Sequence, residues 1–176
     1  MVRKVNIISF IIILTTSSYG IYAQNKCGMT RKLLKFNLRS TNTIDTTAIY
    51  QYDGEFSRDS NDKLYYARYG YENYYKFYGN GKVGYFGLQE KKNLSLEKMN
   101  PCHFLNAYYG VDNTGNYILK RFAKTKANGS YTIKCFLKFR GDTLQIIDED
   151  QINTGYKKIF IKKSIPREWL IYKPDW

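Results

Sequence analysis

Apolar and polar residues alternate along several segments of the chain. In the clearest segment, "YTIKCFLKF", one face carries Tyr131, Ile133, Cys135, Leu137 and Phe139, and only Phe136 breaks the polar pattern of the other face. A period of two over this length is typical of a strand with one face against a core. The segments "YKKIFIKK", "TLQIID", "GNYILKRF", "AIYQY" and "KLYYARY" repeat the pattern less regularly and predict further strands.

Turn-forming residues separate these segments, at nearly even intervals from Asn113 onward. They occur as "GNG" (79–81), "DNTG" (112–115), "ANG" (127–129), "RGD" (140–142) and "NTG" (153–155). Even spacing with Asn-Gly pairs predicts consecutive hairpins and eight or nine strands. A meander of this kind leaves exposed edges unless it closes or stacks. We therefore expect an all-β, mainly antiparallel fold: a small up-and-down barrel, or else a two-sheet sandwich.

Helical signals are few. "TRKLLKFNLR" is compatible with a short amphipathic helix or with an opening strand. "PREWL" begins with Pro166, a residue favoured in the first turn of a helix, and predicts a short helical turn near the C-terminus.

Two phrases of the sequence resemble the pattern of lipocalin-like barrels. They are "NAYYGVDNTGNYILKRF" and "GSYTIKCFLKFRGDTLQIID", which combine Gly-x-Tyr, a hairpin and Gly-Asp-Thr-Leu. From Tyr74 to Trp176, including "NP" at 100–101 and the final "YKPDW", the chain also resembles small secreted bacterial proteins of unknown function. This resemblance implies a barrel and leaves the activity open.

The first residues have the layout of a secretory signal peptide. Arg3 and Lys4 precede an apolar run from Val5 to Leu14, and "TTSSYGIYAQ" supplies a cleavage region. The apolar run is too short to span a bilayer as a helix. We expect a signal peptide at 1–23, cleavage after Ala23, and a single β-rich domain at 24–176 that is secreted or periplasmic, with no transmembrane segment after cleavage.

The formal charge of the chain is +13, so the exported protein should attract anionic partners. One alternative for its function is therefore a basic structural or interaction protein that contacts an anionic component of the cell envelope. Export argues against nucleic acid as the partner. Strand alternation should scatter the C-terminal cations over two faces; they are Lys157, Lys158, Lys162, Lys163 and Arg167.

Three cysteines in an oxidising compartment allow at most one intramolecular disulfide. Cys135 lies within the alternating strand and is expected to be buried as a small hydrophobic residue. The preferred pairing is therefore Cys27 with Cys102, which leaves Cys135 free.

The sequence contains no catalytic signature. Adjacent Cys102 and His103 would point to opposite faces of a strand, and the cysteines are too far apart for a structural zinc site. "DEDQINTG" lacks the spacing of a calcium loop and is interpreted as a solvated turn. Asp53 and Glu55, two residues apart, are the best local pair of carboxylates. We expect a non-catalytic protein with no cofactor and no metal.

Aromatic residues concentrate in the first half of the predicted domain, where ten of the 18 tyrosines lie between Tyr50 and Tyr85. Alternation in "YYKFYGNGKVGYFG" predicts a hairpin with aromatic residues on both faces. One set pairs across the two strands, and a second set points to the opposite face. That second set, Tyr74, Tyr78 and Phe86, is the candidate ligand or interaction face. The favoured function is a secreted binding module that holds a small apolar or aromatic ligand in the barrel.

Overall fold

The computed structural model describes residues 44–88, 94–101, 105–125 and 129–174, all within one compact unit, Leu33–Pro174. They form a β-rich fold with three 3-10 turns, η1 (Glu97–Met99), η3 (Glu149–Gln151) and η4 (Arg167–Ile171). The strands are β1 (Ala48–Arg58), β2 (Leu64–Ala67), β3 (Glu72–Phe77), β4 (Lys82–Leu88), β5 (Leu105–Val111), β6 (Tyr117–Thr125), β7 (Gly129–Arg140), β8 (Thr143–Asp148) and β9 (Lys157–Ser164).

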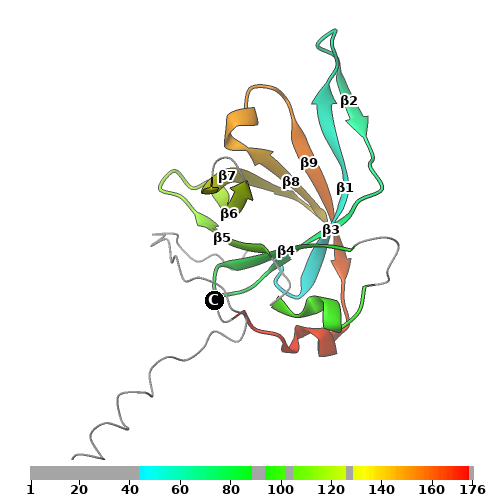
Figure 1. Ribbon diagram of the computed structural model, residues 1–176, viewed down its shortest axis with the longest axis vertical. Coiled ribbons are helices and arrows are strands. Elements are labelled where there is room, and N and C mark those ends of the chain that lie inside the picture. The colour runs from blue at the N-terminus through cyan, green and yellow to red at the C-terminus, as the bar shows by residue number, and fades with distance from the viewer. Residues whose placement is uncertain (1–43, 89–93, 102–104, 126–128, 175–176) are drawn as a thin grey trace, which may run out of the picture. The chain divides into compact units, whose positions relative to one another are not determined.

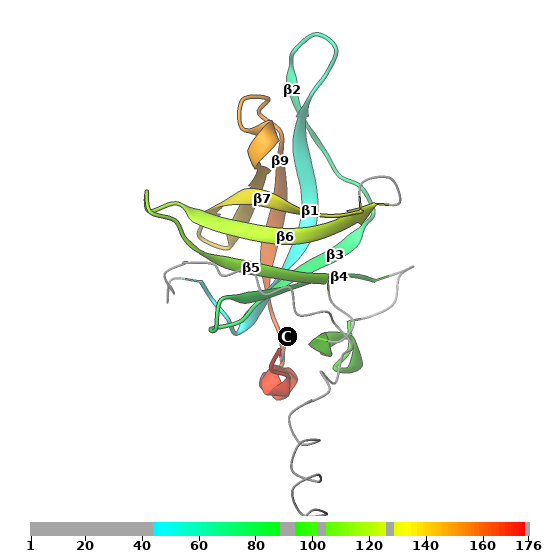
Figure 2. The same cartoon turned by 60° about the vertical axis from the view of Figure 1, so that its left-hand side comes forward.

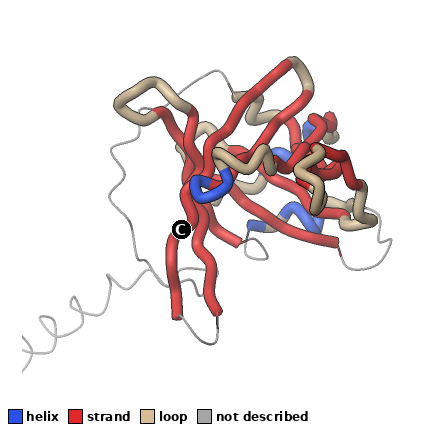
Figure 3. The backbone as a smooth tube through the Cα atoms, turned by 90° about the horizontal axis from the view of Figure 1, so that it is seen from above, coloured by secondary structure: helices blue, strands red, loops and turns tan. Residues whose placement is uncertain are grey.

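The strands form one antiparallel sheet in the order β2-β1-β3-β4-β5-β6-β7-β8-β9, and β1 also pairs with β9 (Figures 1 and 2). This pairing closes eight strands into a barrel, while β2 stays outside as the second strand of a hairpin that projects from one end. The barrel prediction is confirmed over the sandwich. Seen from above, strands dominate and the helical turns are short (Figure 3).

The turns between strands lie at the predicted turn-forming residues. Gly81, Gly115, Gly141 and Gly155 all have positive φ. Gly141 lies in the two-residue connection between β7 and β8, so "RGD" forms a hairpin turn as expected. Residues 126–128 lie outside the described residues. The C-terminal helical turn is confirmed as the 3-10 turn η4, which Pro166 precedes.

Inward-facing side chains fill most of the barrel. Four residues of the "YTIKCFLKF" face belong to or pack on the core, but Tyr131, near the start of β7, is 43% exposed. Tyr75 pairs with Tyr85, and Phe77 pairs with Val83, as the hairpin pattern predicted. The core residues with no exposed surface are Phe77, Val83, Ala107, Leu119, Cys135 and Leu144.

A buried lysine lies on the outer face of β3. Lys76 is 3% exposed, and its ammonium group donates hydrogen bonds to the backbone carbonyls of Thr46 and Ala48. Burial lowers the pKa of Lys76 to about 8, against a small opposing effect of Asp45. An unfolded lysine keeps its proton to about pH 10.5, so the unfolded state binds more protons between these pH values, and stability should rise with pH there.

Comparison with Lys76→Met tests this charge, because methionine keeps the aliphatic chain. The free energy of unfolding of the wild type, relative to the variant, should increase by about 2 kcal/mol between pH 7.5 and 9.5. Denaturant titrations at both pH values measure the difference. Other groups that ionise in this range are shared by both proteins, and an unchanged difference would contradict a lowered pKa of Lys76.

Candidate functional site

A pocket of about 300 Å³ opens at the end of the barrel from which the β1–β2 hairpin projects. Its wall combines aromatic rings with charged and amide groups. Strands β1, β3, β4, β6 and β9 and the β2–β3 connection contribute to it. The lining residues are Tyr52, Glu55, Tyr69, Tyr71, Asn73, Tyr75, Tyr85, Arg121, Lys158 and Phe160.

A β-bulge in β1 shapes one side of the pocket. Tyr52 and Glu55 are three residues apart, so a regular strand would direct them to opposite faces. The register with β9 shifts between Tyr52 and Gly54, and both Tyr52 and Glu55 line the pocket. Gly54 has a steric role, because a Cβ atom there would lie 2.5 Å from the carbonyl oxygen of Ala67.

The bulge also separates the two carboxylates that regular alternation would place on one face. Asp53 accepts a hydrogen bond from Tyr66 and forms an ion pair with Arg68 at 2.7 Å. Glu55 instead accepts hydrogen bonds from hydroxyls inside the barrel. The two acids thus bind different partners, and the structure does not support them as a catalytic pair.

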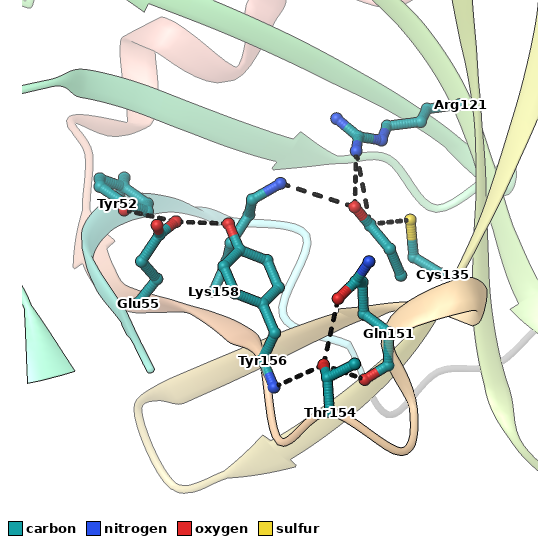
Figure 4. Close-up of polar contacts among 9 residues, drawn as sticks. Tyr52, Glu55, Arg121, Cys135, Gln151, Thr154, Tyr156 and Lys158 are labelled. Carbon is teal, nitrogen blue, oxygen red and sulfur yellow. Dashed lines mark hydrogen bonds and ion pairs between the residues drawn. The ribbon is translucent and has the colours of Figure 1, made fainter. Parts of the chain in front are cut away.

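Glu55 forms the acidic side of the pocket. Its Oε2 atom accepts hydrogen bonds from the hydroxyls of Tyr52 at 3.1 Å and Tyr156 at 2.6 Å (Figure 4). Burial, and then the negative charge of Glu55, raise the pKa of both tyrosines, so the hydroxyls remain protonated donors. The turn before β9 positions Tyr156, whose backbone N–H donates to the hydroxyl of Thr154.

Asp148 organises the basic side. Its carboxylate accepts hydrogen bonds from Nη2 of Arg121 at 3.1 and 3.3 Å, and lies 3.6 Å from Nζ of Lys158. The thiol of Cys135 donates to the same carboxylate at 3.0 Å. Figure 4 shows Arg121, Lys158 and Cys135 converging from three strands. The carboxylate therefore joins β6, β7 and β9 to the end of β8.

Burial within this network favours the thiol form of Cys135 over the thiolate. Cys135 is a free, buried cysteine, as the sequence predicted. Burial, and then the hydrogen bond and charge of Asp148, raise its pKa to about 12. Since the thiolate is the nucleophilic form, Cys135 contributes packing and a hydrogen bond to the network.

The predicted ligand or interaction face has a different location. Tyr74, Tyr78 and Phe86 are 6%, 9% and 6% exposed, and Tyr74 stacks on Phe86 with ring centroids 5.3 Å apart. Tyr74 and Phe86 are paired on the opposite face of the β3–β4 hairpin from the pocket residues Tyr75 and Tyr85. A ligand would reach this face only if it were uncovered, and its role stays a prediction.

Other predicted sites divide between the described and undescribed parts of the chain. Cys27, Cys102 and His103 lie outside the described residues, so the disulfide stays a prediction. Within the described ranges, no group of three or more potential metal ligands comes together. No helix in those ranges is long and apolar enough to cross a membrane.

Sequence patterns missed most of the pocket. The abundance of tyrosine was a regional signal, but it did not select Tyr69 and Tyr71, which stack at the pocket with centroids 5.8 Å apart. Asp148 was assigned to a solvated turn, yet its side chain is only 16% exposed and binds Arg121 and Lys158. These partners are 27 and ten residues away along the chain, so only folding brings them together.

The contribution of the bulge is testable with Gly54→Ala. The new methyl group would overlap the backbone of β2, and we expect a loss of about 1–3 kcal/mol in the free energy of unfolding. Gly70→Ala is the matched control, because no atom lies within 4 Å of its Cβ position. Denaturant unfolding measures both, and equal stabilities would contradict a steric requirement at Gly54.

Tyr74→Ser tests whether the outer face of β3 is core. Loss of a buried aromatic ring should lower the free energy of unfolding by about 3 kcal/mol or more. Tyr65→Ser, at a position that is 44% exposed, provides the control and should change stability much less. A Tyr74→Ser protein as stable as the wild type would instead support an interaction face.

Comparison with known proteins leaves this site to be interpreted from its own geometry. No family model, no curated protein and no solved structure matches the chain.

Proposed function

We propose that the protein is a non-catalytic binding module that holds a small aromatic ligand in the mouth of its barrel. The observation that carries this proposal is the pocket of about 300 Å³, which lies next to the packed core of the barrel. Most ligand sites are concave, apolar or aromatic, and fitted with a few polar groups that orient the ligand. The mouth of the barrel has these properties.

The size of the pocket limits the ligand. A cavity of about 150 Å³ accommodates benzene, so about twice that volume suits one ring with substituents. The volume also lies at the lower end of the range for small-molecule sites. Long chains or fused ring systems would extend out of the mouth, because core side chains fill the barrel beyond Tyr75 and Phe160.

The lining favours an aromatic ligand with a polar substituent over a wholly apolar one. Aromatic side chains pack well against another ring in offset or edge-on geometry. Tyr69 and Tyr71 are 42% and 63% exposed, so their rings are accessible at the rim. Glu55, Arg121 and Lys158 would be desolvated by a wholly apolar ligand without compensation.

The expected export and the lipocalin-like pattern are consistent with such a carrier. A secreted barrel with one open end is suited to sequester a small molecule outside the cytoplasm. Both features rest on the sequence, and they support the proposal without identifying the ligand.

The alternative, a basic protein that contacts an anionic envelope component, receives less support. Lys158 pairs with Asp148 in the barrel mouth, and Lys162 pairs with Asp142 at 2.7 Å. Lys157 lies over the ring of Phe56. These cations therefore have different local partners and do not form one unpaired cluster.

The rim tyrosines provide a direct test with 4-methylphenol as the probe. The wild type should bind it, and Tyr69→Ala/Tyr71→Ala should weaken binding by about tenfold, because each ring contact contributes about 0.5–1.5 kcal/mol. Both side chains are exposed, so the double variant should fold. Calorimetric titration gives the affinity, and NMR shift changes give the location.

Tyr65→Ala is the matched control. Tyr65 has a similar exposure to Tyr69 and lies on β2, just before the connection that carries Tyr69, but it does not line the pocket. It should bind the probe like the wild type. Failure of the wild type to bind small aromatic molecules, or shift changes outside the mouth, would refute the proposed function.

A further inference from the structure

Two cations at the basic side of the pocket rely on one carboxylate. Arg121 and Lys158 share the single carboxylate of Asp148. Glu55, the other acid of the site, already accepts two hydrogen bonds from Tyr52 and Tyr156. Within the described residues, Asp148 supplies the only carboxylate within ion-pair distance of Arg121 and Lys158, although the charge of Glu55 makes the four groups neutral overall.

Three hydrogen-bond donors at this end lack protein acceptors. Nε of Arg121 is buried and has no hydrogen-bond partner. The hydroxyls of Tyr75 and Tyr85 make no hydrogen bond within the described part of the chain, although both residues line the pocket. Nε of Arg121 is the buried one, and buried donors are nearly always paired in folded proteins, so an acceptor from outside the chain would complete this arrangement.

The two tyrosines are suited to donate. Burial raises the pKa of Tyr75 and Tyr85, and the charge of Arg121 opposes this effect only in part. Their hydroxyls consequently stay protonated at neutral pH. Hydrogen bonds from a guanidinium group and hydroxyls to an ionised acceptor are stronger than those to a neutral one.

We propose that the ligand is an aromatic carboxylate, with its ring near Tyr69 and Tyr71 and its carboxylate towards Arg121, Tyr75 and Tyr85. This inference rests on the proposed function and specifies its ligand class. A carboxylate supplies acceptors for the unpaired donors and a second anionic partner for Arg121 and Lys158. An ammonium ligand would find one carboxylate in the lining, that of Glu55, and would be repelled by Arg121 and Lys158.

A matched series of probes separates charge from shape. 4-Methylbenzoate, 4-methylbenzamide and 4-methylbenzylamine have the same ring with an anionic, a neutral and a cationic substituent, and 4-methylphenol is the common reference. At pH 7 the wild type should bind the benzoate about tenfold more tightly than the benzamide, the difference expected for a charge-assisted hydrogen bond. Calorimetric titration of the full mature chain measures all four.

Variants of Arg121 and Tyr85 test whether the preference for the benzoate arises at the basic side of the pocket. Arg121→Gln removes the charge and should abolish the preference for the benzoate. Tyr85→Phe keeps the ring, removes one donor and should weaken the benzoate about fivefold while leaving the benzamide unchanged. It remains informative if Arg121→Gln fails to fold. Tyr65→Phe, which removes an exposed hydroxyl outside the pocket, is the control and should behave like the wild type.

The outcomes distinguish the two proposals. Equal binding of benzoate and benzamide, or tightest binding of the benzylamine, would overturn the carboxylate inference while leaving aromatic binding intact. Loss of binding by every probe, 4-methylphenol included, would overturn the proposed function and this inference with it. A benzoate preference that persists in both Arg121→Gln and Tyr85→Phe would also contradict the proposed site.

Discussion

The backbone pairing of β1 with β9 is the constraint on which the rest of the structure depends. It runs from Ala48 opposite Ser164 to Phe56 opposite Lys157 and joins the first strand of the barrel to the last. Without it, the meander would be an open sheet with two exposed edges. Closure also gives every strand an inner and an outer face. Successive residues of a strand therefore point in turn into the barrel and away from it. The pocket exists because the interior is enclosed on all sides but remains open at one end.

The bulge within this same pairing links closure to the candidate site. An additional residue between Tyr52 and Gly54 changes the phase of β1, so Glu55 faces inward opposite Lys158. Large side chains fill an eight-stranded barrel readily, and here tyrosine and phenylalanine rings occupy most of the interior. Charged side chains replace them towards the mouth. The pocket therefore combines aromatic rings with charged side chains in its lining.

Charges in the mouth are stabilised as a group. Removing a charged group from water is costly unless partners replace the lost hydration. Asp148 binds Arg121, Lys158 and the thiol of Cys135, and two tyrosine hydroxyls bind Glu55. The buried Nε of Arg121 is the exception, since it has no partner. The donors left unpaired in an otherwise satisfied arrangement are the feature that supports the proposed ligand.

Local chemistry in the sequence determined the strands, the glycine turns, the helical turn after Pro166 and the inward set of aromatic residues, because these depend on alternation and on backbone preferences of neighbouring residues. The tertiary structure alone decided the closure, since pairing of β1 with β9 depends on contacts between distant segments. It also decided the site: a single bulge reversed the side of β1 that Glu55 occupies, and folding brought Asp148 to Arg121. Alternation separates two faces of a strand, but it carries no information about which face a closed barrel will cover or leave open.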